Sequence, residues 1–156
     1  MISAFLQRVL QGDEEAIASF GAAEHCAVID WRDGPTEIVS AIAAFLPAGH
    51  LVAEGRGDSI YGVVVHEEPP RSVLVSWPTK QEDLLARINA ILSPDFELRQ
   101  FRPFDGDGYS LFVAPRAVWS EIERTHPEAT ERLFLTADRL AAYWRKGYFA
   151  RLFAKP

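Results

Sequence analysis

The chain has 156 residues, one Cys, a net charge of −6 at pH 7 and an apolar fraction of 48%. This length fits one domain whose core needs neither disulfides nor a structural metal. The composition excludes a coiled coil, a collagen and a disordered chain. One Cys, no basic and apolar leader, and no apolar run of about 20 residues predict a cytoplasmic protein without a membrane span.

The charge is spread unevenly along the chain. Residues 139–156 hold five basic residues and no acidic one, whereas the first 138 residues hold 11 basic and 22 acidic residues, a net charge of −11. An acidic body therefore ends in a basic segment. Such an asymmetry concerns association rather than fold, and the acidic body argues against nucleic acid as a partner.

The first half of the chain predicts helices and strands in alternation. Apolar spacings of three and four residues predict a helix with its apolar face over residues 2–10, and Asp13 is placed to cap a second short helix that ends at Gly21. Residues 26–31 are short and mostly apolar, as in a buried strand, and a helix from Pro35 ends before residue 47. Three strands follow, and their short connections favour an antiparallel meander; they are predicted over residues 51–54, 60–66 and 72–77.

The second half begins with the helix that the pattern defines best. Thr79 and Glu82 form a capping-box pattern, and one apolar face continues to Leu92. Residues 96–102 alternate imperfectly, which predicts a strand with room for a bulge. The remaining predicted elements are a turn at 105–108, a strand at 109–114, helices at 115–126 and from 127, and a last helix from Thr136 to Gly147.

This mixed order with short links between strands predicts a single α+β domain over residues 1–156. We expect one sheet of five or six mostly antiparallel strands, with helices packed mainly on one of its faces. No linker or low-complexity segment marks a domain boundary.

The segment Asp30, Trp31, Arg32 and Asp33 is the first candidate site. It lies where a predicted buried strand ends and a helix begins, a place where ligands often bind in sheets with a strand–helix unit. Two carboxylates, a guanidinium and an indole suit a cation or a polar partner. A structural role is the alternative, in which Asp33 caps the helix, Asp30 pairs with Arg32 or a Lys, and Trp31 packs.

Further acidic residues extend this candidate into a binding surface for a basic protein or peptide. Complementary charge would accelerate such an association. The predicted surface adds Glu54, Asp58, Glu67 and Glu68 to Asp30 and Asp33.

The basic C-terminal segment is a second candidate, this time an interface. Trp, Tyr and Arg are the side chains that most often dominate protein interfaces, and they are frequent in this segment. It either docks on its own core or contacts a partner, including a second copy in a homodimer. Its candidate residues are Tyr143, Trp144, Arg145, Lys146, Tyr148, Phe149, Arg151 and Phe153.

No residue is assigned to catalysis, to a metal or to a cofactor. The four His residues lack the spacing of a metal site, and Asp105 begins a turn rather than a calcium loop. Cys26 is expected to be a buried structural thiol, because its neighbour His25 would point to the opposite face of a strand.

Segments 28–33 and 92–99, with Trp119 after a Pro, resemble small uncharacterised acidic bacterial proteins. Some proteins of this size and acidity are immunity proteins that neutralise a toxin. The similarity to that type rests on size, charge and the lack of a catalytic motif, and it transfers no functional residue.

Three functions follow as hypotheses. The first is a binding protein, not an enzyme, that engages a basic partner through its acidic surface, with toxin neutralisation as one version. The second is a small hydrolase or transferase with a carboxylate-lined cleft near residues 30–33, which needs a pocket where these groups meet a His or Cys. The third is self-association through the basic aromatic segment.

Overall fold

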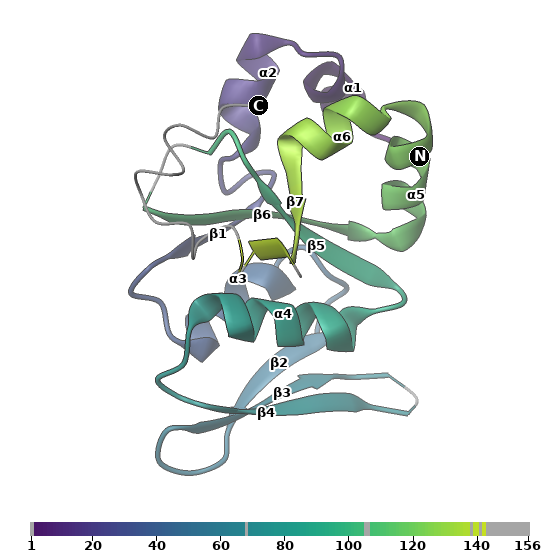
Figure 1. The fold of residues 1–156 in the computed structure, drawn as a ribbon. Coiled ribbons are helices and arrows are strands. Elements are labelled where there is room, and N and C mark those ends of the chain that lie inside the picture. Colours follow the sequence, from purple (N-terminus) through teal and green to yellow (C-terminus); the bar gives the residue numbers. More distant parts are fainter. Residues whose placement is uncertain (1, 68, 105–106, 138, 141, 143–156) are drawn as a thin grey trace.

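The computed structural model describes residues 2–67, 69–104, 107–137, 139–140 and 142 (Figure 1). Within these residues the chain folds into helices and two antiparallel sheets. The helices are α1 (Ala4–Leu10), α2 (Glu14–Phe20), α3 (Pro35–Ala43), α4 (Gln81–Leu92), α5 (Arg116–Thr125) and α6 (Pro127–Leu133). The strands are β1 (Ala27–Asp30), β2 (Leu51–Gly55), β3 (Ile60–Val65), β4 (Arg71–Ser76), β5 (Phe96–Phe101), β6 (Gly108–Pro115) and β7 (Phe134–Thr136).

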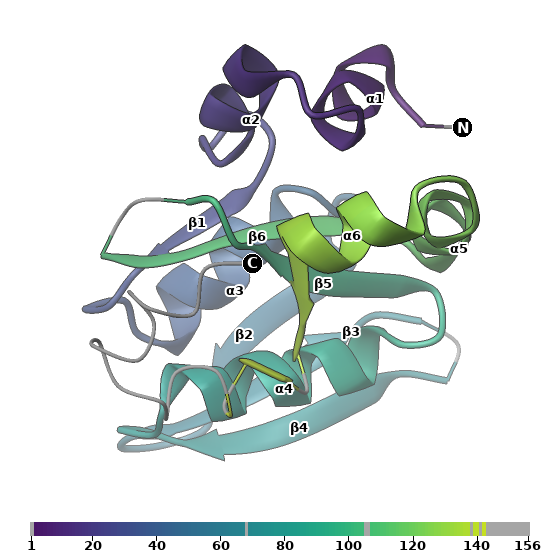
Figure 2. The same ribbon diagram turned by 45° about the horizontal axis from the view of Figure 1, so that its top comes forward.

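The elements stack in layers. A four-stranded sheet has the order β1-β6-β5-β7, and a three-stranded sheet has the order β2-β3-β4. Helices α3 and α4 lie between the two sheets, and α1, α2, α5 and α6 lie over the other face of the four-stranded sheet (Figures 1 and 2). The α+β class and the β2-β3-β4 meander are therefore confirmed.

The expectation of a single sheet with helices mainly on one face is wrong. Seven strands divide between two sheets in the described part of the chain, and helices cover both faces of the four-stranded one. The apolar face of α4 explains the division, because Leu84, Leu85 and Ile88 are fully buried among residues of both sheets. A helix with such a face fills the space between two sheets and keeps them apart.

Strand β5 shows why its sequence alternates imperfectly. Leu98 faces the core that α4 shares, whereas Phe101 faces the core under the other helices. A strand that is buried on both faces has no solvent side to mark with polar residues. Its pairing with β6 runs in continuous register from Phe96 to Gln100, without the bulge that the sequence allowed.

Two polar residues on β5 are buried as an ion pair. Arg99 and Glu97 are 5% and 6% exposed, and Arg99 Nε donates to Glu97 Oε1 over 2.6 Å. Arg99 Nη2 also donates to Glu123 Oε1 over 2.6 Å, and Arg116 pairs with Glu97. The guanidinium of Arg99 lies 4.2 Å from the ring centroid of Trp119 on α5. These partners offset the cost of removing both charges from water.

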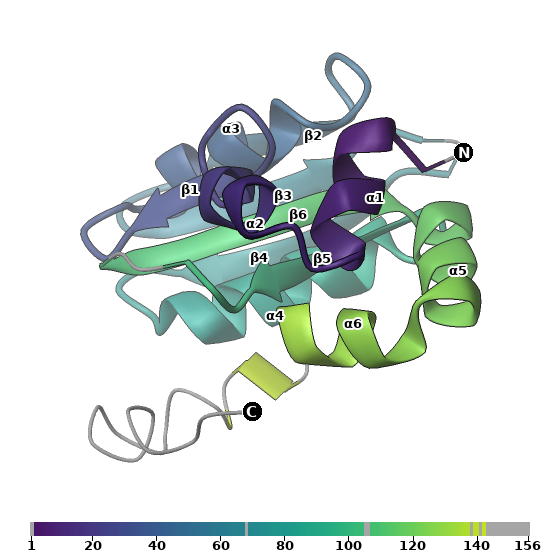
Figure 3. The same ribbon diagram turned by 90° about the horizontal axis from the view of Figure 1, so that it is seen from above.

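The core under α1, α2, α5 and α6 is rich in aromatic rings. Phe20 lies 4.9 Å from Phe101 and 5.2 Å from Phe112 between ring centroids. Trp119 is fully buried, and its indole N–H donates to the carbonyl of Glu97 over 2.9 Å. Figure 3 shows these helices over the strands from above. The packed side chains of these helices bury this face of the sheet.

The ends of several elements differ from the expectations. The capping box at Thr79 is wrong: Lys80 is the N-cap of α4 and makes no side-chain hydrogen bond there. Asp13 caps α2 as expected, with its carboxylate accepting from the amide of Ala16. Strand β7 was not predicted, and Thr136 ends that strand before helical residues follow at 137, 139, 140 and 142.

Among the described residues, none of the helices has the length and apolar character to cross a bilayer. The same residues contain no group of three or more His, Cys, Asp or Glu arranged to hold a metal ion.

Candidate functional site

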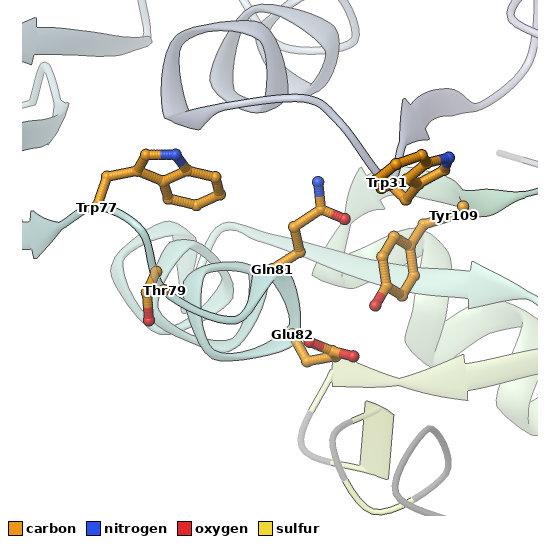
Figure 4. Close-up of a pocket in the computed structure, with 7 residues that line it drawn as sticks. Trp31, Trp77, Thr79, Gln81, Glu82 and Tyr109 are labelled. Carbon is orange, nitrogen blue, oxygen red and sulfur yellow. The ribbon is translucent and has the colours of Figure 1, made fainter. Parts of the chain in front are cut away.

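A hollow of about 350 Å³ opens where β1, β6, α4 and the segment after β4 meet. We call it the aromatic hollow, because three of its walls are rings. In Figure 4, Trp77 stands on one side, and Trp31 and Tyr109 stand on the other, with Gln81 and Glu82 between them. Its lining residues are Trp31, Trp77, Thr79, Gln81, Glu82, Gly108 and Tyr109. The volume is near the lower end of the range for small-molecule pockets, which suits a ligand the size of one side chain.

The turn from Asp30 to Asp33 forms one rim of the hollow. The amide of Asp33 donates to the carbonyl of Asp30 over 3.0 Å, and the Asp33 carboxylate accepts from the amide of Asp30 over 2.7 Å. Arg32 Nε donates to Asp30 Oδ1 over 3.0 Å. This hydrogen bond is the main cause that lowers the pKa of the Asp30 carboxyl below its ordinary value of 3.8. The Arg32–Asp30 pair matches the structural role that the sequence left open.

Asp33 does not cap α3, although the structural role of this segment included such a cap. Gly34 is the N-cap of α3, and no side chain makes the capping hydrogen bond. Instead, the Asp33 carboxylate accepts the hydrogen bond from the amide of Asp30 within the same turn. Trp31, at the tip of this turn, does not pack into the core, since it is 64% exposed.

Gln81 fastens the turn to the start of α4. Its side-chain amide donates to the carbonyl of Asp30 over 3.0 Å and to the carbonyl of Asp33 over 2.9 Å. One residue at the first position of a helix thus fixes a turn that lies about 50 positions earlier in the sequence. The rim that carries Trp31 is held in place relative to Glu82.

Gly108 allows β1 to approach the start of β6. Its φ is +145°, and a Cβ at this position would lie 2.0 Å from the carbonyl oxygen of Ile29. Only Gly fits that backbone and that distance. The close pairing of Asp30 with Gly108 brings the Trp31 turn beside Tyr109, which is 5% exposed.

Charged groups of both signs lie at the hollow. The guanidinium of Arg32 lies 5.3 Å from the ring centroid of Trp31, so this indole already contacts a cation. The Glu82 carboxylate lines the hollow and makes no hydrogen bond or ion pair with another described residue. Glu82 and Asp83 lie in the first turn of α4, where their charges offset the positive end of the helix dipole.

Acidic side chains surround the hollow at one end of the molecule. The β2–β3 hairpin reaches this end, because the amide of Trp77 donates to the carbonyl of Ser59 over 2.7 Å. In Figures 1 and 2, the turn after β1, the hairpin, the start of α4 and the start of β6 all lie on the left. We call this region the acidic end; it contains Asp30, Asp33, Glu37, Glu54, Asp58, Glu82, Asp83 and Asp107, against Arg32, Arg56 and Lys80.

The structure brings together four of the six acidic residues predicted for the binding surface, namely Asp30, Asp33, Glu54 and Asp58. Glu54 is paired with Arg56 over 2.6 Å. Glu67 follows the far end of β3, in contact with other partners: its carboxylate accepts from Arg71 over 2.6 Å and lies 3.3 Å from His50 Nε2. The predicted surface therefore divides between two ends of the three-stranded sheet, and Glu68 lies outside the described residues.

The predicted C-terminal interface lies outside the part of the chain that the structure describes. Residues 143–156, which include all eight of its candidate residues, lie outside the described residues. Self-association through that segment stays a prediction.

Among the described residues, neither a Cys nor a His lines the aromatic hollow. Cys26 is fully buried beneath the helices on the other face of the sheet, where its thiol is 3.3 Å from the carbonyl oxygen of Phe20. Burial raises the pKa of this thiol to about 12, so it is protonated at neutral pH. No described His lines the hollow either. Of the groups that the hydrolase hypothesis named, only Trp31 lines the hollow among the described residues.

Sequence reasoning missed most of the hollow. Trp77, Gln81, Glu82 and Tyr109 come from segments far from Trp31 in the chain. Trp77 carried a weak signal, as an aromatic residue at the end of a predicted strand next to Pro78. Tyr109 followed a predicted turn. Their convergence depends on the pairing of β1 with β6 and on the Gln81 hydrogen bonds, and neither leaves a local pattern.

The chain matches no family model, and comparisons with curated proteins and with solved structures find no match either.

Proposed function

We propose that this chain is a non-enzymatic binding protein of a bacterial cytoplasm that engages a basic protein or peptide through the acidic end. Neutralising a basic toxin, as immunity proteins do, is one version of this function. The observation that carries the proposal is the excess of carboxylates around an aromatic hollow at the same end of the molecule.

Charge supports this proposal in two ways. Asp58, Asp83 and Asp107 are exposed, and none of them makes an ion pair with a described residue. Their field extends about one Debye length into solution, where it attracts a positively charged partner and accelerates association. The aromatic rings supply the second requirement of an interface, because rings bury a large area at a small cost in side-chain entropy.

The chemistry of the hollow also favours binding over catalysis. Its polar side chains include one carboxylate, one amide and two hydroxyls, from Glu82, Gln81, Thr79 and Tyr109. The Cys or His that the hydrolase hypothesis required is not among the described lining residues, and no hydrogen bond joins the Thr79 hydroxyl to the Glu82 carboxylate. The same groups are well suited to contact a polar or charged side chain.

The test uses a fluorescently labelled tetra-arginine peptide with both termini blocked. Fluorescence anisotropy at low ionic strength measures its affinity for the protein and for the triple variant Asp58→Asn, Asp83→Asn, Asp107→Asn. Each exposed charge contributes about 0.2 to 1 kcal/mol, so the triple variant should bind about tenfold more weakly. None of these three residues lines the hollow, and the affinity should decrease as salt is added.

A matched control carries the same change in net charge at other places on the molecule. Glu14, Glu15 and Glu128 are exposed and lie in the first turns of α2 and α6, away from the acidic end. Replacing all three with Gln should leave the affinity within about twofold of the unmodified protein. Equal losses in the two triple variants, or no binding of the peptide at low ionic strength, would contradict the proposal.

A further inference from the structure

We infer that the aromatic hollow is the receptor for one guanidinium group of the basic partner, which would stack on its rings with the Glu82 carboxylate as counterion. This inference rests on the proposed function and specifies it, because it assigns an arginine side chain to one cavity. The bound group would contact Trp31 and Trp77, while Tyr109 would form the inner wall.

The rings are the first reason for a guanidinium. A planar, weakly hydrated cation is attracted to the electron-rich face of an aromatic ring, and Trp is the best partner of this kind. Trp31 already has such a neighbour, since the Arg32 guanidinium lies 5.3 Å from its ring centroid. Figure 4 shows Trp77 across the hollow from Trp31 with Gln81 between them, so a second guanidinium entering on either side of Gln81 would face an indole.

The carboxylate is the second reason. Arg32 is paired with Asp30 and is therefore not the counterion of Glu82. Glu82 is only partly exposed, lines the hollow and has no hydrogen-bonded or ionic partner among the described residues. A carboxylate in the lining of an aromatic cavity disfavours an anion and leaves a cation as the better-matched occupant.

The rigid frame is the third reason. Gln81 ties the Trp31 turn to α4 by two hydrogen bonds, and the approach at Gly108 fixes the turn beside β6. The backbone that carries Trp31 is thus held before a ligand arrives, which lowers the entropy cost of binding. A hollow of about 350 Å³ is large enough for one long side chain.

The experiment titrates the full chain with Nα-acetyl-arginine methylamide and follows its indole N–H signals by NMR. Signals are assigned with single Trp→Phe variants. The signals of Trp31 and Trp77 should shift in a saturable way, whereas that of Trp119, which is buried and bonded to Glu97, should not move. Nα-acetyl-citrulline methylamide has nearly the same shape without the charge and should bind about tenfold more weakly.

Paired variants locate the counterion. Glu82→Gln should weaken the binding of the arginine derivative about five- to tenfold. Glu128→Gln is the matched control, because Glu128 also lies in the first turn of a helix, on α6 at the other face of the sheet. That control should bind the arginine derivative as the unmodified protein does.

Three results would overturn the inference. The first is equal binding of the arginine and citrulline derivatives. The second is a response of the Trp31 and Trp77 signals to methyl glucoside, a neutral sugar, but not to the arginine derivative. The third is the absence of a saturable shift at either indole. If tetra-arginine still binds and still depends on Asp58, Asp83 and Asp107, only the assignment of the hollow fails. If tetra-arginine does not bind, the proposed function fails as well.

Discussion

Two tryptophan–arginine pairs lie on opposite sides of the four-stranded sheet, and they differ in almost every physical respect. Trp119 is fully buried, its indole N–H is hydrogen-bonded to Glu97, and Arg99 lies 4.2 Å from its ring centroid. Trp31 is 64% exposed, and Arg32 lies 5.3 Å from its ring centroid at the edge of the aromatic hollow.

The difference separates a structural use of this pairing from a binding use. The groups around Trp119 satisfy one another, since Arg99 contacts Glu97, Glu123 and the indole. At the hollow the Trp31 indole remains accessible, and Glu82 has no described partner. Substitutions at the first pair should therefore change stability, and substitutions at the second should change binding.

The largest effect is expected from Arg99→Met. The substitution leaves Glu97 buried with Arg116 as its remaining cation, and it should reduce the free energy of unfolding by about 3 kcal/mol in chemical denaturation. The double variant Glu97→Leu, Arg99→Met removes both buried charges and should recover most of this loss. A single variant within about 0.5 kcal/mol of the unmodified protein would show that the buried network contributes little.

A substitution at Gly108 should destabilise the pairing of β1 with β6 that supports the hollow. Gly108→Ala places a Cβ against the carbonyl of Ile29 at a φ of +145°, and should reduce the free energy of unfolding by about 2 kcal/mol or more. Gly55→Ala is the control, since a Cβ there meets nothing within 4 Å. Equal stabilities of the two variants by thermal unfolding would contradict the close approach of β1 to β6.

The two indoles themselves provide the direct contrast. Trp119→Phe removes the donor to the Glu97 carbonyl in a buried place and should cost about 2 kcal/mol. Trp31→Phe changes an exposed side chain and should alter the free energy of unfolding by less than about 0.5 kcal/mol. Denaturant titrations compare them, and a loss at Trp31 as large as that at Trp119 would remove the distinction.

The smallest effect concerns pH. The Arg32 hydrogen bond lowers the pKa of Asp30, so the carbon NMR titration of this carboxyl should have its midpoint below 3.8, and Arg32→Gln should move the midpoint towards 3.8. Because the pKa is lowered by folding, the pair stabilises the protein above the ordinary pKa and loses its contribution as the pH falls. The difference in thermal midpoint between the protein and Arg32→Gln should therefore shrink below pH 3.8. A difference that grows on acidification would contradict the pairing.

Local sequence patterns predicted most helices and strands, but they did not predict which distant strands pair in the four-stranded sheet. The helices α1, α2 and α4 follow from apolar spacing, and the β2-β3-β4 meander follows from short connections. The four-stranded sheet does not, because β7 pairs with β5 across β6 and two helices, and β1 pairs with β6 across about half of the chain. The number of predicted strands does not show which strands pair with each other.

The candidate site was predicted in part for the same reason. The strand end at Asp30–Asp33 indicated one rim of the hollow, since such ends often carry ligands. Trp77, Glu82 and Tyr109 join it only through tertiary contacts. The acidic composition indicated a basic partner, but Glu67 shows that net charge does not locate a surface, because His50 and Arg71 lie next to its carboxylate.

The most direct test of the account is the set of intermolecular NOEs in the complex with blocked tetra-arginine. We predict contacts from arginine side-chain protons to the rings of Trp31 and Trp77. Contacts confined to the outer face of the three-stranded sheet, where Leu74 is 66% exposed, or an absence of contacts to both rings in a saturated complex, would contradict the claim that the acidic end binds through its aromatic hollow.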